Sequence, residues 1–169
     1  MEPDTPSVDI RPAQEADLPA ILDIYNDAIL NSTATFETVP RTLEEQGQWL
    51  REHSHPYAVL AAIHDGDVVG WACLSHFRPR PAYRFTAEDS VYVRADFWGK
   101  GLGTLLLARL LEVAASNGFH TVIALIVGDN PASLRLHRGF GFRRVGVERE
   151  VGYKFDRWLD VVIMQKTLK

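Results

Sequence analysis

The sequence has little that would place this protein in a membrane or outside the cell. Its 169 residues include a single cysteine, Cys73, so no internal disulfide framework can form, and one thiol suits a reducing compartment. The first residues, MEPDTPSVD, lack the apolar run of a signal peptide. No apolar stretch approaches the roughly 20 residues that cross a bilayer. We therefore expect a cytoplasmic protein with no membrane segment.

An excess of positive charge is also missing. The formal net charge is -4, whereas a nucleic-acid partner requires a basic face, so we expect no nucleic-acid partner. We also expect no metal site. Hydrophobic residues make up 46% of the chain and charged residues 24%, as in an ordinary globular protein. Length and composition fit a single domain over residues 1–169, with a flexible lead at residues 1–7.

Hydrophobic periodicity predicts a mixed α/β domain with the element order β-α-α-β-β-β-α-β-α-β-β. The strands are expected at residues 8–11, 57–63, 68–75, 87–93, 121–127, 142–148 and 159–166. The helices are expected at residues 18–29, from 42 through 50, from 102 to an Asn-Gly stop at 117–118, and from 130 to about 139–141. Such a pattern indicates a sheet covered by helices.

Local signals mark the ends of several elements. Asp17 stands where it can cap the first helix, and Thr42 with Glu45 forms a capping-box pattern for the second. Asn130, followed directly by Pro131, is a strong helix start. Residues 64–67, His-Asp-Gly-Asp, predict a tight hairpin turn between two strands.

A glycine-rich turn precedes the long third helix. Gly99, Gly101 and Gly103 let the chain bend tightly, and the amide groups at the helix start favour an anion there, with Lys100 adding a full charge. The spacing fits neither a Walker loop nor a dinucleotide fingerprint. Taken alone, the pattern indicates a phosphate cradle or a plain tight turn.

Two motifs together resemble the GNAT superfamily of N-acetyltransferases. The acetyl-CoA loop of that superfamily, [RQ]xxGx[GA], matches residues 98–103, although Trp98 replaces the usual Arg or Gln, and a later signature matches residues 130–142. Further blocks at 25–28, 31–36, 77–83, 88–93 and 151–158 resemble the phosphinothricin/methionine sulfoximine acetyltransferase family. The resemblance implies the GNAT fold, with a central mixed, largely antiparallel sheet flanked by helices.

The same resemblance implies acetyl-CoA as co-substrate and assigns the residues that bind it. These are Val91, Tyr92, Val93, Gly99, Lys100, Gly101, Leu102, Gly103, Thr104, Asn130 and Ser133. Asn130 is assigned to the pantetheine arm, although helix capping would explain this residue equally well.

Acetyl transfer to an amine requires a base, and Glu88 is the candidate. Strand alternation places Glu88, Ser90 and Tyr92 on one face of their strand and Asp89 on the other. A carboxylate just before the cofactor loop can take the amine proton directly or through water. A structural carboxylate is the competing interpretation, and Asp89 is the nearest rival for the role of base.

The departing thiolate requires an acid, and two residues compete for this role. The resemblance points to His137, which a capping or solvent-facing role would also explain, and Tyr92 is the alternative. Cys73 would permit an acetyl-cysteine intermediate, but its apolar strand favours a buried core thiol. We therefore expect direct transfer in a ternary complex.

The acceptor is expected to be a small amino acid analogue. Arg78 and Arg80, each followed by proline, suit carboxylate or phosphinate oxygens. The expected acceptor site comprises these two arginines with Phe36, Tyr83 and Glu88, and Phe77 and Tyr92 are further candidates for its walls. Resemblance implies phosphinothricin, methionine sulfoximine or methionine sulfone as acceptor.

Resemblance also implies a homodimer, to whose active site Lys154, Arg157 and Trp158 contribute. Two other functions stay open on the sequence. One is a GNAT enzyme for another primary amine, such as a polyamine, an aminoglycoside or a protein N-terminus. The other is a non-catalytic acyl-CoA-binding module, against which the joint presence of Glu88, Tyr92 and His137 counts.

Overall fold

The computed structural model describes residues 7–168, so most of the expected lead at residues 1–7 lies outside the described residues. The predicted element order is confirmed. The strands are β1 (Asp9–Pro12), β2 (Val59–His64), β3 (Asp67–His76), β4 (Thr86–Val93), β5 (Thr121–Val127), β6 (Arg143–Lys154) and β7 (Arg157–Thr167). The helices are α1 (Leu18–Asn31), α2 (Leu43–Glu52), α3 (Leu102–Ser116) and α4 (Pro131–Gly139).

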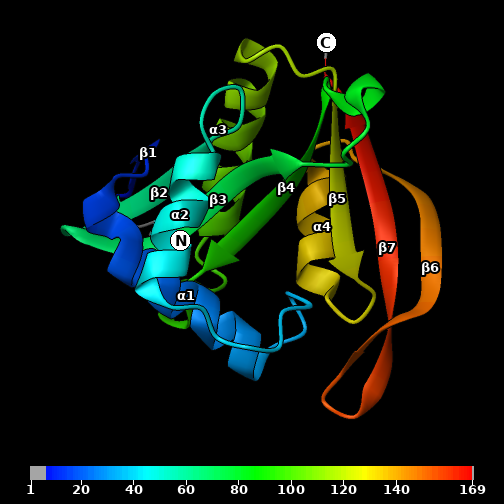
Figure 1. Cartoon of the computed structure of the whole chain (residues 1–169), viewed down its shortest axis with the longest axis horizontal. Coiled ribbons are helices and arrows are strands. Elements are labelled where there is room, and N and C mark those ends of the chain that lie inside the picture. Colours follow the sequence, from blue (N-terminus) through cyan, green and yellow to red (C-terminus); the bar gives the residue numbers. More distant parts are fainter. Residues whose placement is uncertain (1–6, 169) are drawn as a thin grey trace, which may run out of the picture.

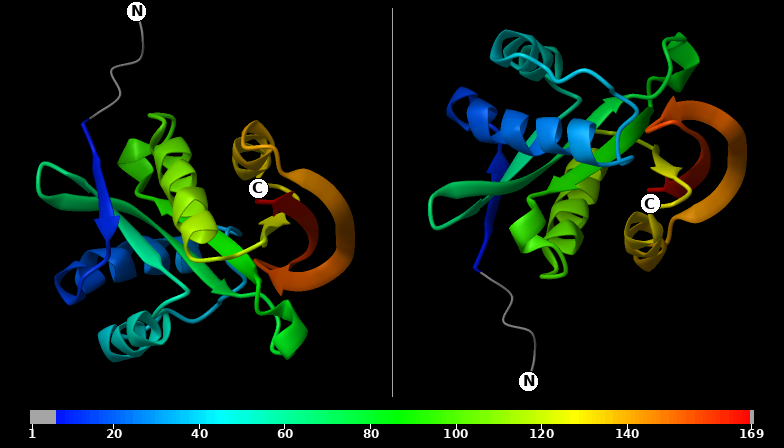
Figure 2. Two further views of the ribbon diagram at one scale, coloured as in Figure 1. Left: turned by 90° about the horizontal axis from the view of Figure 1, so that it is seen from above. Right: turned by 90° about the horizontal axis from the view of Figure 1, so that it is seen from below.

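A seven-stranded sheet with the order β1-β2-β3-β4-β5-β7-β6 forms the middle layer. Neighbouring strands pair antiparallel except β4 and β5, which pair parallel. Helices α1 and α2 cover one face of the sheet, and α3 and α4 lie on the other (Figures 1 and 2). The predicted fold, a largely antiparallel mixed sheet flanked by helices, is therefore confirmed.

Strands β4 and β5 separate after a short parallel pairing. The last pair of residues that joins them is Glu88 and Ile123. Beyond this point β4 continues to Val93 along β3, and β5 continues along β7 (Figure 1). The two strands thus form a fork in the sheet, and we call this gap the β4–β5 fork.

Each face of the sheet has its own hydrophobic core. Leu102, Leu106 and Leu110 of α3 are spaced at helical intervals and pack into one core. Ile21 and Ile29 of α1 join Trp71 of β3 in the other. Burial of these apolar side chains on both faces holds β3 and β4 rigidly in the middle of the molecule.

The predicted caps are confirmed for two helices and wrong for one. The Thr42 hydroxyl accepts the Glu45 N–H at the start of α2, and the Asn130 amide oxygen accepts the Ser133 N–H at the start of α4. Asp17 precedes α1 but does not cap it with its side chain. Its carboxylate instead accepts hydrogen bonds from the Arg11 guanidinium and the Gln14 N–H, because a charged partner lies within reach on β1.

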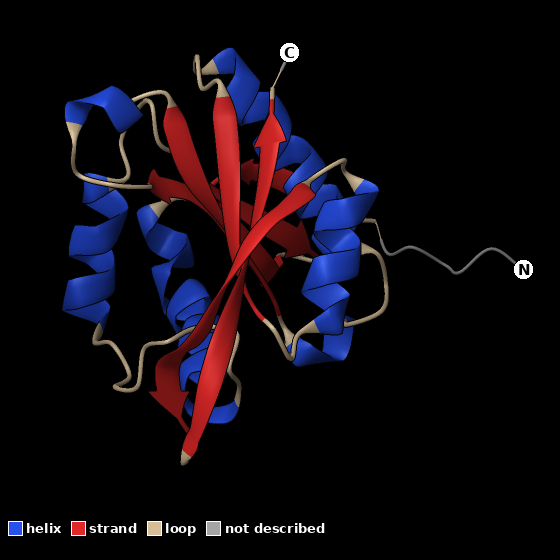
Figure 3. Cartoon of the chain, turned by 90° about the vertical axis from the view of Figure 1, so that its right-hand side faces the viewer, coloured by secondary structure: helices blue, strands red, loops and turns tan. Residues whose placement is uncertain are grey.

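Of the two hairpins, β2–β3 and β6–β7, only the first has a turn that its residue types predict. The predicted turn between β2 and β3 is confirmed, with positive φ angles at Asp65 (49°) and Gly66 (87°). The β6–β7 hairpin extends further than predicted, because its turn residues, Phe155 and Asp156, adopt positive φ without glycine. A register shift between Glu148 and Gly152 also interrupts the pairing, and the long hairpin reaches past the rest of the sheet (Figure 3).

Candidate active site

The glycine-rich turn forms an open anion cradle at the start of α3. Gly99 and Gly101 have φ angles of 74° and 80°, which other residues rarely adopt. No side chain caps the helix at Gly101, so its first amide groups are left for a ligand. A Cβ added at Gly99 or Gly101 would meet nothing within 4 Å, so the turn has room for a phosphate group.

The other residues of the turn fix its position. Leu102 is buried in the core, Gly103 brings α3 close to Leu136 of α4, and Thr104 lies in the first turn of the helix. The Lys100 ammonium lies 5.0 Å from the centre of the Phe97 ring. The Trp98 indole, at the position where the motif usually has Arg or Gln, donates to the Val93 carbonyl at 2.8 Å. Trp98 therefore ties the cradle to the end of β4.

The β4–β5 fork brings the other predicted cofactor residues to the same place. Val91, Tyr92 and Val93 follow the last β4–β5 pair, so no ladder of hydrogen bonds joins them to β5. Helix α4, which begins with Asn130 and Ser133, directly follows β5 (Figure 1). The fork and the cradle are therefore adjacent, because β4 leads directly into the glycine turn before α3.

The pKa of the Glu88 carboxyl group departs strongly from its ordinary value. Glu88 occupies the last β4 position paired with β5 and is partly buried. Burial, helped by the negative charge of Asp89, raises the pKa of Glu88 to about 7. A carboxyl group with a pKa near the working pH is suited to accept a proton from an amine.

Asp89 points to the opposite face of β4, as strand alternation predicts. Its Oδ2 lies 2.8 Å from His137 Nε2 on α4, and its side chain is fully buried. On the other face of the strand, Tyr92 stacks on Trp71 of β3, with ring centres 4.7 Å apart. Glu88 and Tyr92 therefore share the face of the sheet that α1 covers, and Asp89 does not.

His137 is buried and hydrogen-bonded at both ring nitrogens. Nε2 faces Asp89, and Nδ1 lies 2.8 Å from the Ser133 carbonyl oxygen. Burial by itself would lower the pKa of His137, but the hydrogen bond and charge of Asp89 raise it above the ordinary value. The histidine is therefore neither solvent-facing nor a helix cap.

The two remaining candidates for chemistry differ in environment from Glu88. Burial raises the pKa of Tyr92 above its ordinary value, so the phenol keeps its proton. Burial also raises the pKa of Cys73 to about 12. Since the thiolate is the nucleophilic form, this environment disfavours an acetyl-cysteine intermediate.

Three contacts anchor the α1–α2 loop, residues 32–42, to the far end of the chain. The Phe36 ring packs on Gly152 of β6, where an added Cβ would lie 2.3 Å from Phe36 Cζ. The buried Lys154 ammonium donates to the Thr35 carbonyl at 2.9 Å. Asp129 accepts hydrogen bonds from both Thr33 and Arg157. Trp158, the third residue expected from the C-terminal block, is exposed and packs edge-on against Tyr153.

The arginine-rich loop lies elsewhere, between β3 and β4 at the end of β4 that carries Glu88. The Arg78 guanidinium lies 4.8 Å from the Phe77 ring centre and 5.6 Å from that of Tyr83. Arg80 is exposed and precedes a short 3-10 turn at Pro81–Tyr83. Phe36 and the Arg78 loop thus have different neighbours in the structure, although the sequence predicted that both line one acceptor site.

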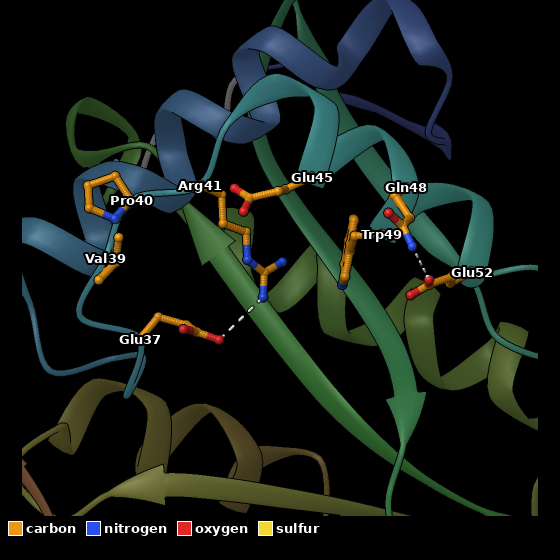
Figure 4. Close-up of a pocket in the computed structure, with 8 residues that line it drawn as sticks. All are labelled: Glu37, Val39, Pro40, Arg41, Glu45, Gln48, Trp49 and Glu52. Carbon is orange, nitrogen blue, oxygen red and sulfur yellow. Dashed lines mark hydrogen bonds and ion pairs between the residues drawn. The ribbon is translucent and has the colours of Figure 1, made fainter.

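A groove of about 390 Å³ opens between the α1–α2 loop and α2. Arg41 and Trp49 project into it in front of β4 (Figure 4). Arg41 lies over the Tyr25 ring, and Trp49 packs edge-on against Trp71. The groove is completed by Glu37, Val39, Pro40, Glu45, Gln48 and Glu52. Sequence reasoning missed this groove, because a helical tryptophan and a loop arginine carry no functional pattern of their own.

Both walls of the groove lead to the Glu88 face of β4. Tyr25 packs against Tyr92 with ring centres 5.3 Å apart, and Trp71 stacks on the same tyrosine. A small molecule in the groove would therefore lie on the Glu88 side of the sheet, opposite the Asp89–His137 pair. Among residues 7–168, no group of three or more His, Cys, Asp or Glu side chains is placed to hold a metal ion. No helix in this range is long and apolar enough to cross a membrane.

Comparison with known proteins defines an N-acetyltransferase that uses acetyl-CoA as co-substrate. Residues 19–142 match the model of the Acetyltransferase (GNAT) family, and the chain belongs to this family. It is 44% identical over 164 residues to the L-methionine sulfoximine/L-methionine sulfone acetyltransferase of Pseudomonas paraeruginosa, covering 96% of this chain and 95% of the relative.

Solved structures agree with this assignment. A phosphinothricin acetyltransferase from Sinorhizobium meliloti, in complex with AcCoA, superposes with a TM-score of 0.92 at 39% identity, covering 95% of this chain and 88% of that one. A ribosomal-protein-alanine N-acetyltransferase from Brucella melitensis gives a TM-score of 0.92 at 46% identity, covering 94% of this chain and 99% of that one. Relatives with this fold therefore include enzymes named for small-molecule and for protein acceptors.

Proposed function

We propose that this N-acetyltransferase moves the acetyl group of acetyl-CoA directly to the α-amine of a small amino acid analogue. Phosphinothricin, methionine sulfoximine and methionine sulfone are the proposed acceptors. The observation that carries the proposal is Glu88, whose pKa is raised to about 7 at the edge of the β4–β5 fork. The two relatives, which are named for these three acceptors, support the choice.

The glycine cradle and the fork would hold the co-substrate. Gly99, Gly101 and the first amide groups of α3 would bind its diphosphate, with Lys100 close by. Backbone groups of residues 91–93 and the start of α4 would line the pantetheine arm. Bound acetyl-CoA supplies the thioester that acylates the amine.

Glu88 would act as the general base. With its pKa raised to about 7, a substantial fraction of Glu88 is ionised at neutral pH, and this carboxylate can take the proton of the acceptor ammonium directly or through a water. Tyr92, on the same face of β4, and His137, on the other, remain the two proposed sources of the proton for the leaving sulfur. Backbone amides of residues 91–93 would polarise the carbonyl.

The loop that carries Arg78 and Arg80 favours an acceptor with an acidic or polar end group. Arg78 and Arg80 are exposed beside the Glu88 end of β4, and their guanidinium groups suit carboxylate, phosphinate or sulfonyl-type oxygens. Tyr83, which lies beside Arg78, would contact the aliphatic part of the acceptor. The groove between the α1–α2 loop and α2 offers a route for the acceptor to the same face.

We further propose a cytoplasmic homodimer. The β6–β7 hairpin exposes several large apolar side chains, which a second copy would cover. These are Val145, Val151, Tyr153, Phe155 and Trp158. The single buried Cys73 suits a reducing compartment.

The test of the proposed function is Glu88→Gln, which keeps the shape of the side chain and removes the base. We expect kcat to fall by about 10²–10⁴-fold, while the Kd of acetyl-CoA, measured by calorimetry, changes less than about twofold. Glu112→Gln is the matched control, because Glu112 is exposed on α3 and pairs with Arg109. A non-catalytic binding module would show no turnover to lose, and an unchanged kcat would remove Glu88 from the mechanism.

A further inference from the structure

Asp89 forms a buried pair with His137, and the proposed chemistry gives the Asp89 carboxylate no role of its own. The Asp89 side chain is fully buried and that of His137 is 5% exposed, and Oδ2 and Nε2 are 2.8 Å apart. The other oxygen of Asp89, Oδ1, has no hydrogen-bond partner among the described residues. Burying a carboxylate with one unpaired oxygen costs free energy of folding, so this arrangement calls for an explanation.

Hydrogen-bond chemistry fixes the number of protons that the pair holds. The Ser133 carbonyl can only accept, so Nδ1 of His137 must carry a proton. The contact between Nε2 and Oδ2 requires one further proton. The pair therefore shares one proton, and the ion-paired form is an imidazolium beside a carboxylate, with no ring nitrogen left to act as a base.

The pair spans the β4–β5 fork at its narrow end. Asp89 is the first β4 residue beyond the last β4–β5 pair, and His137 lies on α4, the helix that follows β5. The ion pair thus connects β4 to α4 where the sheet itself no longer connects β4 to β5. Phe142, itself buried, packs edge-on against the His137 ring, with ring centres 4.9 Å apart.

We propose that Asp89 is a positioning residue for acetyl transfer: its carboxylate keeps His137 doubly protonated and thereby fixes α4 against β4 beside the fork. This proposal rests on the proposed function, because it concerns the same site. The other titratable groups whose charge acts on Asp89 or its surroundings are Glu88 on β4 and Cys73 on β3. From α4, His137 itself faces the carboxylate.

Nuclear magnetic resonance of the histidine ring nitrogens tests the pair without any turnover. In the unmodified enzyme, the His137 signals, identified by their loss in His137→Gln, should show both nitrogens protonated at about pH 8, above the ordinary histidine pKa of about 6.5. In Asp89→Asn, His137 should be neutral at this pH, with its proton on Nδ1. A His137 that titrates near its ordinary pKa in the unmodified enzyme overturns the proposal.

The pH dependence of kcat, at saturating acetyl-CoA, tests whether the pair matters for transfer. Asp89→Asn should lose about tenfold more kcat at pH 8.5 than at pH 6, because its His137 is neutral at the higher pH. The acidic limb of the pH profile of kcat should also move to lower pH, because the negative charge of Asp89, which helps to raise the pKa of Glu88, is absent from this variant. Once the shift of the Glu88 limb has been allowed for, a purely structural Asp89 would lower kcat equally at every pH, and that result overturns the proposal.

A double variant removes both charges and guards against a misfolded single variant. If Asp89 acts only through His137, then Asp89→Asn/His137→Gln and His137→Gln alone should have the same kcat within about twofold. A further loss in the double variant would show that Asp89 acts independently and would overturn the proposal. Failure to acetylate any amino acid analogue would refute the proposed acceptor, whereas the nuclear magnetic resonance result would still test the pair by itself.

Discussion

At the scale of single residues, Glu88 determines how the activity should depend on pH. The base must be ionised, and burial raises its pKa to about 7, so kcat/KM should fall tenfold for each pH unit below about 7. The measurement is a pH–rate profile of thiol release at low acceptor concentration. A profile that stays flat down to about pH 5, near the pKa of an ordinary glutamate, would show that no group with a pKa near 7 acts as the base and would contradict the raised pKa of Glu88.

The same residue should cost the protein stability at neutral pH. Its folded-state pKa, about 7, lies above the ordinary value of 4.5, so the folded state holds this proton more tightly than the unfolded state. That contribution to the free energy of unfolding is fully present below about pH 4.5 and is lost as pH rises through about 7.

Glu88→Gln should therefore be more stable than the unmodified enzyme at pH 8, by roughly 1–3 kcal/mol, and should lose this advantage near pH 4.5. Urea unfolding at both pH values measures the difference. An equal stability at pH 8 would mean that the carboxylate is well solvated in the folded state, and the argument for a raised pKa would then fail.

At the scale of elements, the α1–α2 loop depends on the β6–β7 hairpin for its position. Gly152→Ala would place a methyl group 2.3 Å from the present position of Phe36 Cζ, so the ring must move. We expect a loss of about 1–3 kcal/mol in the free energy of unfolding and a raised KM for the acceptor, with the KM for acetyl-CoA unchanged.

Gly146→Ala is the matched control on the same strand. A Cβ at Gly146 meets nothing within 4 Å, so stability and both KM values should stay close to those of the unmodified enzyme. Thermal unfolding and steady-state kinetics on the two variants provide the comparison. If both variants behave alike, the contact between Phe36 and Gly152 does not position the acceptor loop.

Local signals explain why most elements could be predicted from the sequence. The Thr42 and Asn130 caps act over three residues, and the Asp65-Gly66 turn has the residues that its backbone requires. The end of the β6–β7 hairpin could not be predicted, because Phe155 and Asp156 are unusual at positive φ. Asp17 was assigned wrongly because its partner, Arg11, lies on another element.

At the scale of the whole molecule, the apolar β6–β7 hairpin should mediate the proposed dimer. Analytical ultracentrifugation should give twice the chain mass of 19.0 kDa, and Trp158→Asp should shift the protein to the monomer. Leu30→Asp is the control, since Leu30 is a similarly exposed apolar residue on α1. A monomer in the unmodified protein, or equal effects of the two substitutions, would contradict this interface.

The candidate site was predictable only where its residues are close in sequence. The glycine turn and Glu88 could be recognised from short motifs, and the structure places them around one fork. The Asp89–His137 pair joins residues 48 apart, and the contact between Lys154 and Thr35 spans 119. Such contacts depend on the three-dimensional arrangement of the elements, and no local pattern indicates them.

The most direct test of the central claim is a thiol-release assay with acetyl-CoA and a panel of acceptors. The panel contains phosphinothricin, methionine sulfoximine, methionine sulfone, spermidine and a basic peptide. We predict turnover with the first three and none with spermidine or the peptide, because Arg78 and Arg80 favour an anionic end group. Turnover confined to spermidine or the peptide would contradict the proposed acceptor class.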